Sequence, residues 1–457
     1  MLEFVKEGVM EEIKRGRLFL YNLSSAGHAL FDNLLNFYYA IFLLPPAEKI
    51  AAGMKQYIPE QVFFGVFTVL GIIMIFARFI DGFADPFIGY FSDHSRSKLG
   101  RRRVFMLAAT IPLAVSTALI FFPPVPEISY INVIFYAVVF GSCFLFYTMY
   151  VAPYIALIPE LGHTEKKRVS ITTTQGYCAL AGGLISMIGG PWLISLGEGM
   201  GMGITHAYQF MAVIMGVTGA ILLMLAVLGV DEKRYSNAKP VTTPFFKSIK
   251  ITLGNSAFII FMLANMTLWF VFNTVRSSLN HVTITLVKGN EGDAGIYFIV
   301  IFGSAAAFFM LVWYLVRKIG KKNVMMLGLG LFAVLGVLLA LTGIIPVPPG
   351  VWVIVVFALI GFPVAVFLIV PNVFISEVCD LDYQKTGIRR EAMYFGVHGF
   401  FQTFTLGLSA AALAFFYSAF GKDIANPLGV RLTLLFAAAI ALAGFFIIQH
   451  YPGKQKT

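Results

Sequence analysis

The chain has 457 residues, of which 58% are hydrophobic and only 12% are charged, and its formal net charge is +10. A soluble protein of this size is about half apolar and a quarter charged, so the chain lacks the polar surface that a water-soluble globule needs. It is therefore an integral membrane protein. Its basic residues are better explained by orientation in the membrane than by a nucleic-acid partner.

The first sixteen residues mix charged and apolar side chains. Leu2, Val5, Val9 and Ile13 recur at helical spacing, which predicts a short helix on the membrane interface. Several glutamates and the lack of a long apolar core argue against a secretory signal peptide. Farther along, the cysteines show no metal or disulfide spacing, and we expect them to be packing residues: Cys143, Cys178 and Cys379.

Apolar segments follow, each long enough to cross a hydrocarbon core of roughly 30 Å. Twelve transmembrane helices are predicted, at residues 18–46, 61–92, 104–122, 129–160, 169–196, 208–229, 256–287, 295–316, 324–345, 351–378, 391–420 and 430–450. An even number of crossings places both termini on one side. The seventh helix is the least regular, because Asn273, Arg276 and Asn280 interrupt its apolar run.

The basic residues decide which side that is. Most of the 33 Lys and Arg residues lie near the termini and in the loops after the even-numbered helices. The loops of the opposite face hold five: Lys49, Lys55, Lys288, Lys422 and Arg431. An excess of basic residues marks the cytoplasmic side. Both termini are therefore predicted to be cytoplasmic, and the protein to lie in the plasma (inner) membrane.

A polar linker at residues 231–255 divides the chain into an N-terminal half, 1–230, and a C-terminal half, 256–457. Pro240 and Pro244 break any helix that would continue through the linker.

The two halves resemble each other. KLGRRRVFML at 98–107 and KIGKKNVMML at 318–327 both follow an even-numbered helix and open the next one. A looser match pairs PYIALIPE at 153–160 with PNVFISE at 371–377. Repeated six-helix halves are typical of secondary transporters, with the substrate site near the midplane.

The second predicted helix carries Arg78, Asp81 and Asp85 on one face. Ionisable residues inside a membrane are costly and usually functional. Two carboxylates and one guanidinium leave a charge of −1, which one proton or one monovalent cation would neutralise, and oxygen ligands suit sodium. The alternative is that the carboxylates only brace the helix. The corresponding positions of the second half are Ile301 and Ala305, so the fold itself does not require these charges.

Asp85-Pro86-x-x-Gly89-x-x-x-Asp93, followed by Gly100-Arg101-Arg102-Arg103, resembles the signature of the glycoside–pentoside–hexuronide:cation symporters, the melibiose permease-like family of the major facilitator superfamily. Residues 152–168 and 380–391 resemble two further blocks of this family, so the resemblance covers both halves. It implies an all-α major facilitator fold of twelve helices in two six-helix halves, working by alternating access.

The resemblance also implies site residues. Asp81, Asp85 and Thr148 match the family's cation site, and Arg78 balances its charge. By analogy with the superfamily, a cytoplasmic gate is expected where Asp93 meets Arg101 or Arg102. The alternative is that the arginines only fix the topology.

The sugar side of the family's site is not retained. The positions of four polar anchors hold Ala29, Val151, Gln175 and Thr403. Other polar residues are candidates for the substrate cavity: His28, Asp32, Asn36, Gln175, Tyr177, Asn273 and Arg276. The alternatives are that His28 and Asp32 hydrogen-bond to neighbouring helices, that Arg276 lies near the outer interface, and that the others are packing residues.

These observations predict a transporter that couples a sodium or proton gradient to uptake of a sugar or glycoside. One alternative solute is an amphipathic molecule such as a lysophospholipid, and another class of function is a non-transporting membrane sensor. No phosphate loop, metal cluster or Ser-His-Asp arrangement is present in the sequence, so an enzyme is not expected. The expected partners are a small-molecule solute, the coupling cation and the lipid bilayer, with no cofactor, and the protein is expected to be a monomer.

Overall fold

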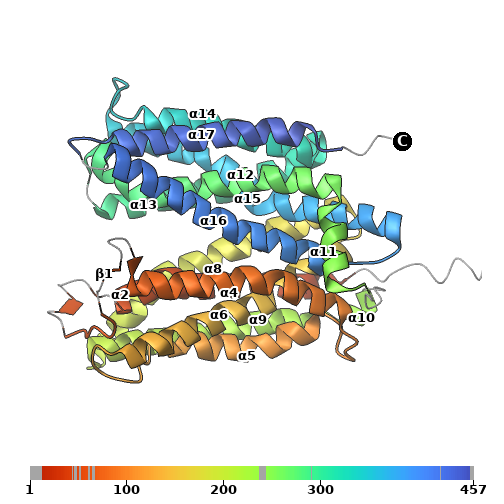
Figure 1. Cartoon of the computed structure of the whole chain (residues 1–457), viewed down its shortest axis with the longest axis horizontal. Coiled ribbons are helices and arrows are strands. Elements are labelled where there is room, and N and C mark those ends of the chain that lie inside the picture. The colour runs from red at the N-terminus through yellow and green to blue at the C-terminus, as the bar shows by residue number, and fades with distance from the viewer. Residues whose placement is uncertain are drawn as a thin grey trace, which may run out of the picture. The chain divides into compact units, whose positions relative to one another are not determined.

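A computed structural model describes residues 13–452 except 44, 46–48, 51–52, 60–61, 64–66, 236–242, 290 and 422–423. The described chain is helical apart from two short strands (Figure 1). The predicted interfacial helix falls mostly on residues outside this range, and the first described helix begins at Arg15.

The chain forms two compact units. Unit 1 comprises Met1–Leu161, Tyr177–Thr242 and Ile388–Gly396, and unit 2 comprises Gly162–Gly176, Thr243–Gly387 and Val397–Thr457. This division departs from the predicted halves at two short segments. The first residues of the helix Glu165–Gly199 belong to unit 2, and the first residues of the helix Glu391–Phe420 belong to unit 1.

Unit 1 contains α1, α4, α5, α6 and α9, and the last four of these run alongside one another in Figure 1. α1 packs on α9, and α6 packs on both α4 and α5. Gly182 of α8 lies so close to Ala26 of α1 that a Cβ at position 182 would overlap the Ala26 backbone. Small residues allow such close helix approach. The bounds are α1 (Arg15–Asn33), continued by η1 (Leu34–Tyr38) and α2 (Tyr39–Leu43), α4 (Val69–His94), α5 (Arg103–Leu119), α6 (Tyr130–Ala156), α7 (Ile158–Leu161), α9 (Ile204–Gly229), α10 (Glu232–Tyr235) and most of α8 (Glu165–Gly199).

Unit 2 is built in a similar way, with α13 packed on α15 and α17 packed on both α12 and α14. Its elements are α11 (Phe245–Leu253), α12 (Ser256–His281), continued by η2 (Val282–Val287), α13 (Glu291–Ile319), α14 (Lys321–Ala340), α15 (Pro349–Thr386), α17 (Leu428–Gln449) and most of α16 (Glu391–Phe420). α12 remains helical through Asn273, Arg276 and Asn280, so these polar residues do not break the seventh predicted helix.

The prediction of helix from residue 61 is wrong at its start. Val62–Phe63 (β1) pairs antiparallel with Phe67–Thr68 (β2), and α4 begins only at Val69. Val, Phe and Thr are residues that favour strands, and an apolar run by itself does not distinguish a strand from the start of a helix.

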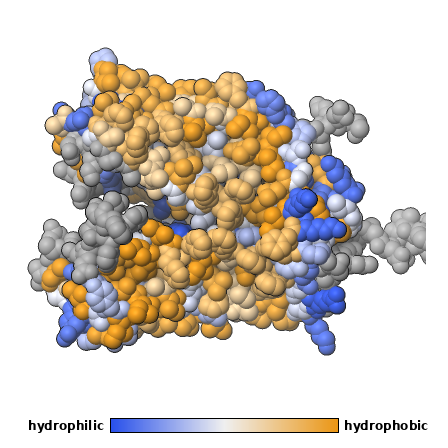
Figure 2. Space-filling model, viewed as in Figure 1, coloured by the Kyte–Doolittle hydropathy of each residue, from blue (hydrophilic) through white to orange (hydrophobic). Residues whose placement is uncertain are grey.

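Nine helices of the described chain are long and apolar enough to cross a membrane. α4 is not among them, since it carries Arg78, Asp81, Asp85 and Asp93, and α5 is a shorter apolar helix. Figure 2 shows apolar side chains over the flanks of the helices, with hydrophilic residues gathered at the helix ends. The chain is therefore a multi-pass membrane protein. Its cysteines Cys143, Cys178 and Cys379 are all free and buried.

Candidate functional site

The charged face of α4 holds Asp81 between two partners. The guanidinium Nη1 of Arg78 lies 3.3 Å from Asp81 Oδ2, and Oγ1 of Thr148, on α6, donates a 2.7 Å hydrogen bond to Asp81 Oδ1. Asp81 is only 8% exposed. The Arg78 guanidinium also lies 4.3 Å from the ring centroid of Phe144, a cation–π contact that restrains it. The structure thus brings together three residues that the sequence analysis assigned to a cation site.

Two further carboxylates interact with this group. Asp85, one turn along α4, interacts with Thr148 and with the charge of Asp81. Asp32 of α1 also acts electrostatically on Asp81, and both aspartates act on Tyr147. From the sequence, Asp32 is a candidate for the substrate cavity and not for the cation site. In the described part of the chain, no group of three His, Cys, Asp or Glu side chains is arranged to hold a metal ion.

His28 of α1 lies among tyrosines of α6. Its ring centroid is 4.7 Å from that of Tyr154 and 5.3 Å from that of Tyr150, both in edge-to-face geometry. The hydroxyls of these tyrosines donate to backbone carbonyls, Tyr150 to Leu223 at 2.6 Å and Tyr154 to Tyr21 at 3.0 Å. The aromatic packing therefore fixes the His28 ring.

The remaining candidate cavity residues belong to both units. Gln175 is buried in unit 2, whereas Tyr177 belongs to unit 1 and is 38% exposed. Asn273 is buried on α12, and Arg276 is half-buried one turn later. The side chain of Asn36 lies outside the described part of the structure.

A dense group of charges, the unit 1 cluster, lies where α4 ends and α5 begins. It comprises Asp93, Arg101, Arg102, Glu160, Glu232 and Glu391. Asp93 Oδ1 is 3.7 Å from Arg101 and 3.4 Å from Arg102, and both arginines also reach Glu391, at 3.0 Å and 2.8 Å. All six residues are at most 5% exposed. The cluster is therefore a dry ion-pair network.

Asp93 has a second role at the first turn of α16. Its carboxylate accepts hydrogen bonds from the backbone N–H groups of Ala392 at 3.3 Å and Met393 at 3.0 Å. A carboxylate suits these otherwise unsatisfied donors and the positive end of the helix dipole. Gly89, one turn before Asp93, packs directly on the Ala392 backbone, where a Cβ would overlap it.

The carboxylate of Glu232, on α10, binds the first turn of α5 as that of Asp93 binds the first turn of α16. It accepts hydrogen bonds from the backbone N–H groups of Arg102 at 3.0 Å and Arg103 at 3.1 Å. Burial, reinforced by the Glu160 carboxylate, raises the pKa of Glu232 above its ordinary value. Burial by itself would lower the pKa of Arg101, but Glu160, Glu391 and Asp93 outweigh it, so that this pKa is raised. Arg101 therefore stays charged.

The sequence alone does not indicate the roles of Glu160, Glu232 and Glu391. Glu160 and Glu391 close two of the quoted motif blocks, and this position was the available signal. Glu232 lies in the polar linker, where a carboxylate is unremarkable until the fold brings it to Arg102.

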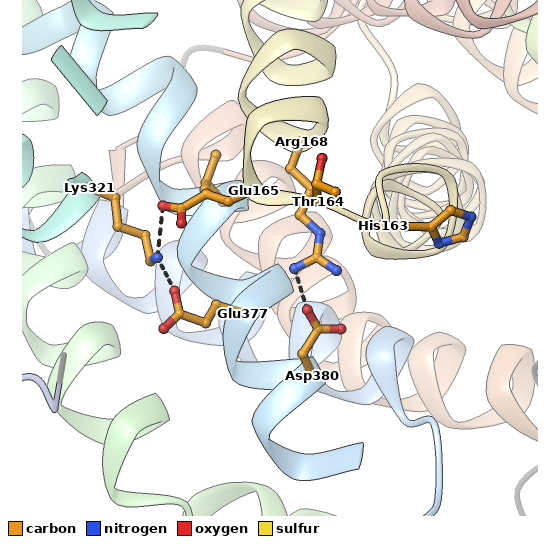
Figure 3. A pocket seen from close by; sticks show the side chains of 8 residues that line it. His163, Thr164, Glu165, Arg168, Lys321, Glu377 and Asp380 are labelled. Atoms are coloured by element: carbon orange, nitrogen blue, oxygen red, sulfur yellow. Dashed lines mark hydrogen bonds and ion pairs between the residues drawn. The ribbon is translucent and has the colours of Figure 1, made fainter. Parts of the chain in front are cut away.

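Unit 2 has a corresponding group, the unit 2 cluster, made of Glu165, Arg168, Lys321, Glu377 and Asp380 (Figure 3). Lys321 forms ion pairs with Glu377 and, at 3.0 Å, with Glu165, and Arg168 lies 2.5 Å from Asp380. The cluster lines a cavity of about 270 Å³, together with His163, Thr164 and Val373.

The two clusters occupy equivalent places in the repeat. Gly100 and Gly320 both have a positive φ, of 114° and 82°, immediately before the basic residue that opens the next segment. That residue is Arg101 in one half and Lys321 in the other, and each pairs with the glutamate that ends the looser repeat. These are Glu160 and Glu377.

Comparisons with known proteins agree with this architecture. The family described as MFS/sugar transport protein matches residues 20–452. An isoprimeverose transporter of Lactiplantibacillus pentosus is 26% identical over 79% of this chain and 74% of its own length. A sodium-dependent lysophosphatidylcholine symporter of Gallus gallus is 25% identical over 83% of this chain and 79% of its own. The crystal structure of a bacterial homologue of the iron transporter ferroportin has the same fold, with a TM-score of 0.66 at 12% identity over 95% of this chain and 98% of that one.

The family match spans nearly the whole chain, and the fold is that of transporters and not of enzymes. The chain belongs to the glycoside–pentoside–hexuronide:cation symporter family of the major facilitator superfamily.

Proposed function

We propose that the chain is a symporter that uses a sodium or proton gradient to take up a sugar or glycoside. In this proposal it has twelve membrane spans with both termini in the cytoplasm. α1 with η1 and α2, α4 and α5 would supply the three spans beyond the nine that are apolar enough on their own.

One observation carries the proposal: Asp81 is buried in the membrane-spanning part of α4 and is held there by Arg78 and Thr148. Charged residues at the centre of a membrane helix are disfavoured by about 3 kcal/mol each, so a helix that carries three of them within two turns is costly unless a function retains them. With Asp85 nearby, the two carboxylates exceed the single guanidinium by one negative charge. A bound sodium ion or proton would neutralise this excess.

The unit 1 cluster is the proposed cytoplasmic gate. Asp93 accepts bonds from the first turn of α16 and pairs with Arg101 and Arg102 in the same place. Releasing that turn would break the hydrogen bonds and the ion pairs together, which makes the contact suitable as a two-state element.

The test is uptake of radiolabelled isoprimeverose into proteoliposomes, driven by an inward sodium or proton gradient. Asp81→Asn and Asp85→Asn are each expected to reduce cation-driven accumulation by about tenfold or more, because the charge that the cation neutralises is gone. Thr148→Val should reduce it less, since only one oxygen ligand is lost.

The matched control is Thr110→Val on α5, whose hydroxyl donates only to the Met106 carbonyl of its own helix. This variant should accumulate solute like the unchanged protein. Undiminished cation-driven accumulation in both aspartate variants would overturn the proposed coupling site.

A second candidate solute is a lysophospholipid, which is favoured by the similarity to the lysophosphatidylcholine symporter of Gallus gallus. The same proteoliposomes distinguish the two solutes, because only one of them should be accumulated in a cation-dependent way.

A further inference from the structure

The short helix α11 (Phe245–Leu253) turns hydroxyl side chains inward and apolar side chains outward. Ser248 and Thr252 are 1% and 0% exposed, whereas Phe246 is 83% exposed and Leu253 is 38% exposed. A surface helix of a soluble protein has the opposite pattern, with its apolar side chains facing the core. The reversed pattern indicates that the outer face of α11 meets an apolar medium.

The outer face of α11 is also basic. Phe246, Lys250 and Leu253 lie at i, i+4 and i+7 and therefore share one side of the helix, with Lys247 next to them. Both lysines are exposed. Neither α11 nor any other part of residues 233–290 contains Asp or Glu. Aromatic and basic side chains together are typical of helices that lie in the plane of a membrane interface.

The connection to α12 keeps α11 beside the membrane. Only two residues separate α11 from the membrane span Ser256–Val287. The joint is fixed, because Oδ1 of Asn255 accepts hydrogen bonds from the backbone N–H groups of Ala257 at 3.1 Å and Phe258 at 3.4 Å. In Figure 1, α12 runs across the view and α11 runs down it. A helix that lies crosswise to a membrane span follows the membrane surface.

A bilayer with anionic lipids suits both properties of this face. The lipid phosphates attract the two lysines, and the boundary between headgroups and acyl chains accommodates the ring of Phe246. A phosphate ion in solution would match the lysines but would leave the ring in water.

We propose that α11 is an interfacial anchor, in which Phe246 and Leu253 insert at the level of the headgroups and Lys247 and Lys250 bind the phosphates of anionic lipids. The anchor would fix the start of α12 at the bilayer surface. The assignment to the cytoplasmic leaflet rests on the proposed topology, whereas the lipid contact itself does not depend on transport.

The test places an environment-sensitive fluorophore on the outer face. Phe246→Cys is labelled with a thiol-reactive nitrobenzoxadiazole in the full chain, whose native cysteines are buried. The protein is placed, one copy per disc, in nanodiscs of phosphatidylglycerol and phosphatidylcholine. We expect blue-shifted emission, strong quenching by nitroxide-labelled lipid and weak quenching by acrylamide in the water.

The matched control carries the same label at Gln384→Cys, an exposed position in the polar last turns of α15. This helix has 38 residues, so it is about 57 Å long and extends well beyond a hydrocarbon core of roughly 30 Å. Acrylamide should quench the label at position 384 several-fold more strongly than the label at position 246.

The double variant Lys247→Gln with Lys250→Gln tests the charges. In the same nanodiscs, the ratio of inserted to water-exposed label at position 246 should fall about fivefold for each lysine removed. The protein with both lysines should show a similar fall in nanodiscs of phosphatidylcholine alone. Lys385→Gln, which removes a charge from α15 instead, should leave the ratio unchanged.

Equal acrylamide quenching at positions 246 and 384 would overturn the anchor and would indicate that the face of α11 binds a soluble protein. Equal insertion with and without phosphatidylglycerol, or with and without the two lysines, would overturn the role of anionic lipid. Both measurements use neither solute nor ion gradient, so their result is separate from that of the uptake experiment.

Discussion

The two ion-pair clusters have the same origin in the repeat but different surroundings. In the unit 1 cluster, the side chains of Asp93, Arg102 and Glu391 are at most 2% exposed. In the unit 2 cluster, the side chains of Glu165 and Asp380 are 45% and 36% exposed and line a cavity. The difference matters because an ion pair is worth little in water, whereas a buried one is strongly destabilising when half of it is removed. The repeat thus provides one buried network and one that water reaches in part, since Arg168, Lys321 and Glu377 remain mostly buried.

The largest effect should come from removing the central cation of each cluster. Arg102→Ala leaves Asp93 and Glu391 buried without a main partner, and we expect a loss of about 3–5 kcal/mol of stability. Lys321→Ala should lose less, about 1–3 kcal/mol, because water reaches Glu165 although Glu377 stays buried. Thermal unfolding in a fixed detergent, followed by scanning fluorimetry, shows which of the two variants loses more stability. Equal losses in the two variants would show that the clusters are energetically alike.

The next largest effect separates the cost of an unfavourable backbone conformation from the cost of displacing neighbouring side chains. Gly100 and Gly320 both have a positive φ, a conformation that disfavours a side chain by about 1–2 kcal/mol. Gly320→Ala meets no atom within 4 Å and should lose only that amount. Gly100→Ala would also displace Glu232 from the first turn of α5, and should melt at a clearly lower temperature. Equal melting temperatures of Gly100→Ala and Gly320→Ala would contradict the expected difference between the two clusters.

The smallest effect concerns the exposed member of the Arg168–Asp380 pair. Asp380→Asn removes the charge of a side chain that is 36% exposed, and should lower stability by about 1 kcal/mol or less. The loss should shrink at high salt, which screens exposed charges. Melting temperatures of Asp380→Asn and of the unchanged protein at low and high salt measure this effect. A loss that salt leaves unchanged would place this cluster with the dry one.

The sequence was informative where one helix or one family motif carries the information. The prediction of a helix at 391–420 matches α16, and Arg78, Asp81 and Thr148, which the family resemblance had grouped, lie in contact. Contacts that depend on packing were not predictable. Arg101 reaches Glu391 across 290 positions of sequence, and Glu232 reaches Arg102 across 130. In the sequence, Glu391 and Glu232 look like ordinary polar residues near the end of a helix.

Trp269 shows a second property that the sequence does not predict. An indole within an apolar helix looks like a packing residue, and its ring does pack on Phe367. Only the fold shows that its N–H is enclosed without a partner among the described residues. Sequence patterns report where side chains tend to lie and not whether their hydrogen bonds are satisfied.

The burial of all three native thiols makes the chain well suited to site-specific labelling. Cys143, Cys178 and Cys379 are shielded in the folded protein, so water-soluble maleimides should react with them slowly. A single cysteine introduced at the partly exposed position of Asp380 would then report by its labelling rate whether the cavity beside it opens or closes as solute and cation are added. The unaltered chain already supplies the low-background reference for such an experiment.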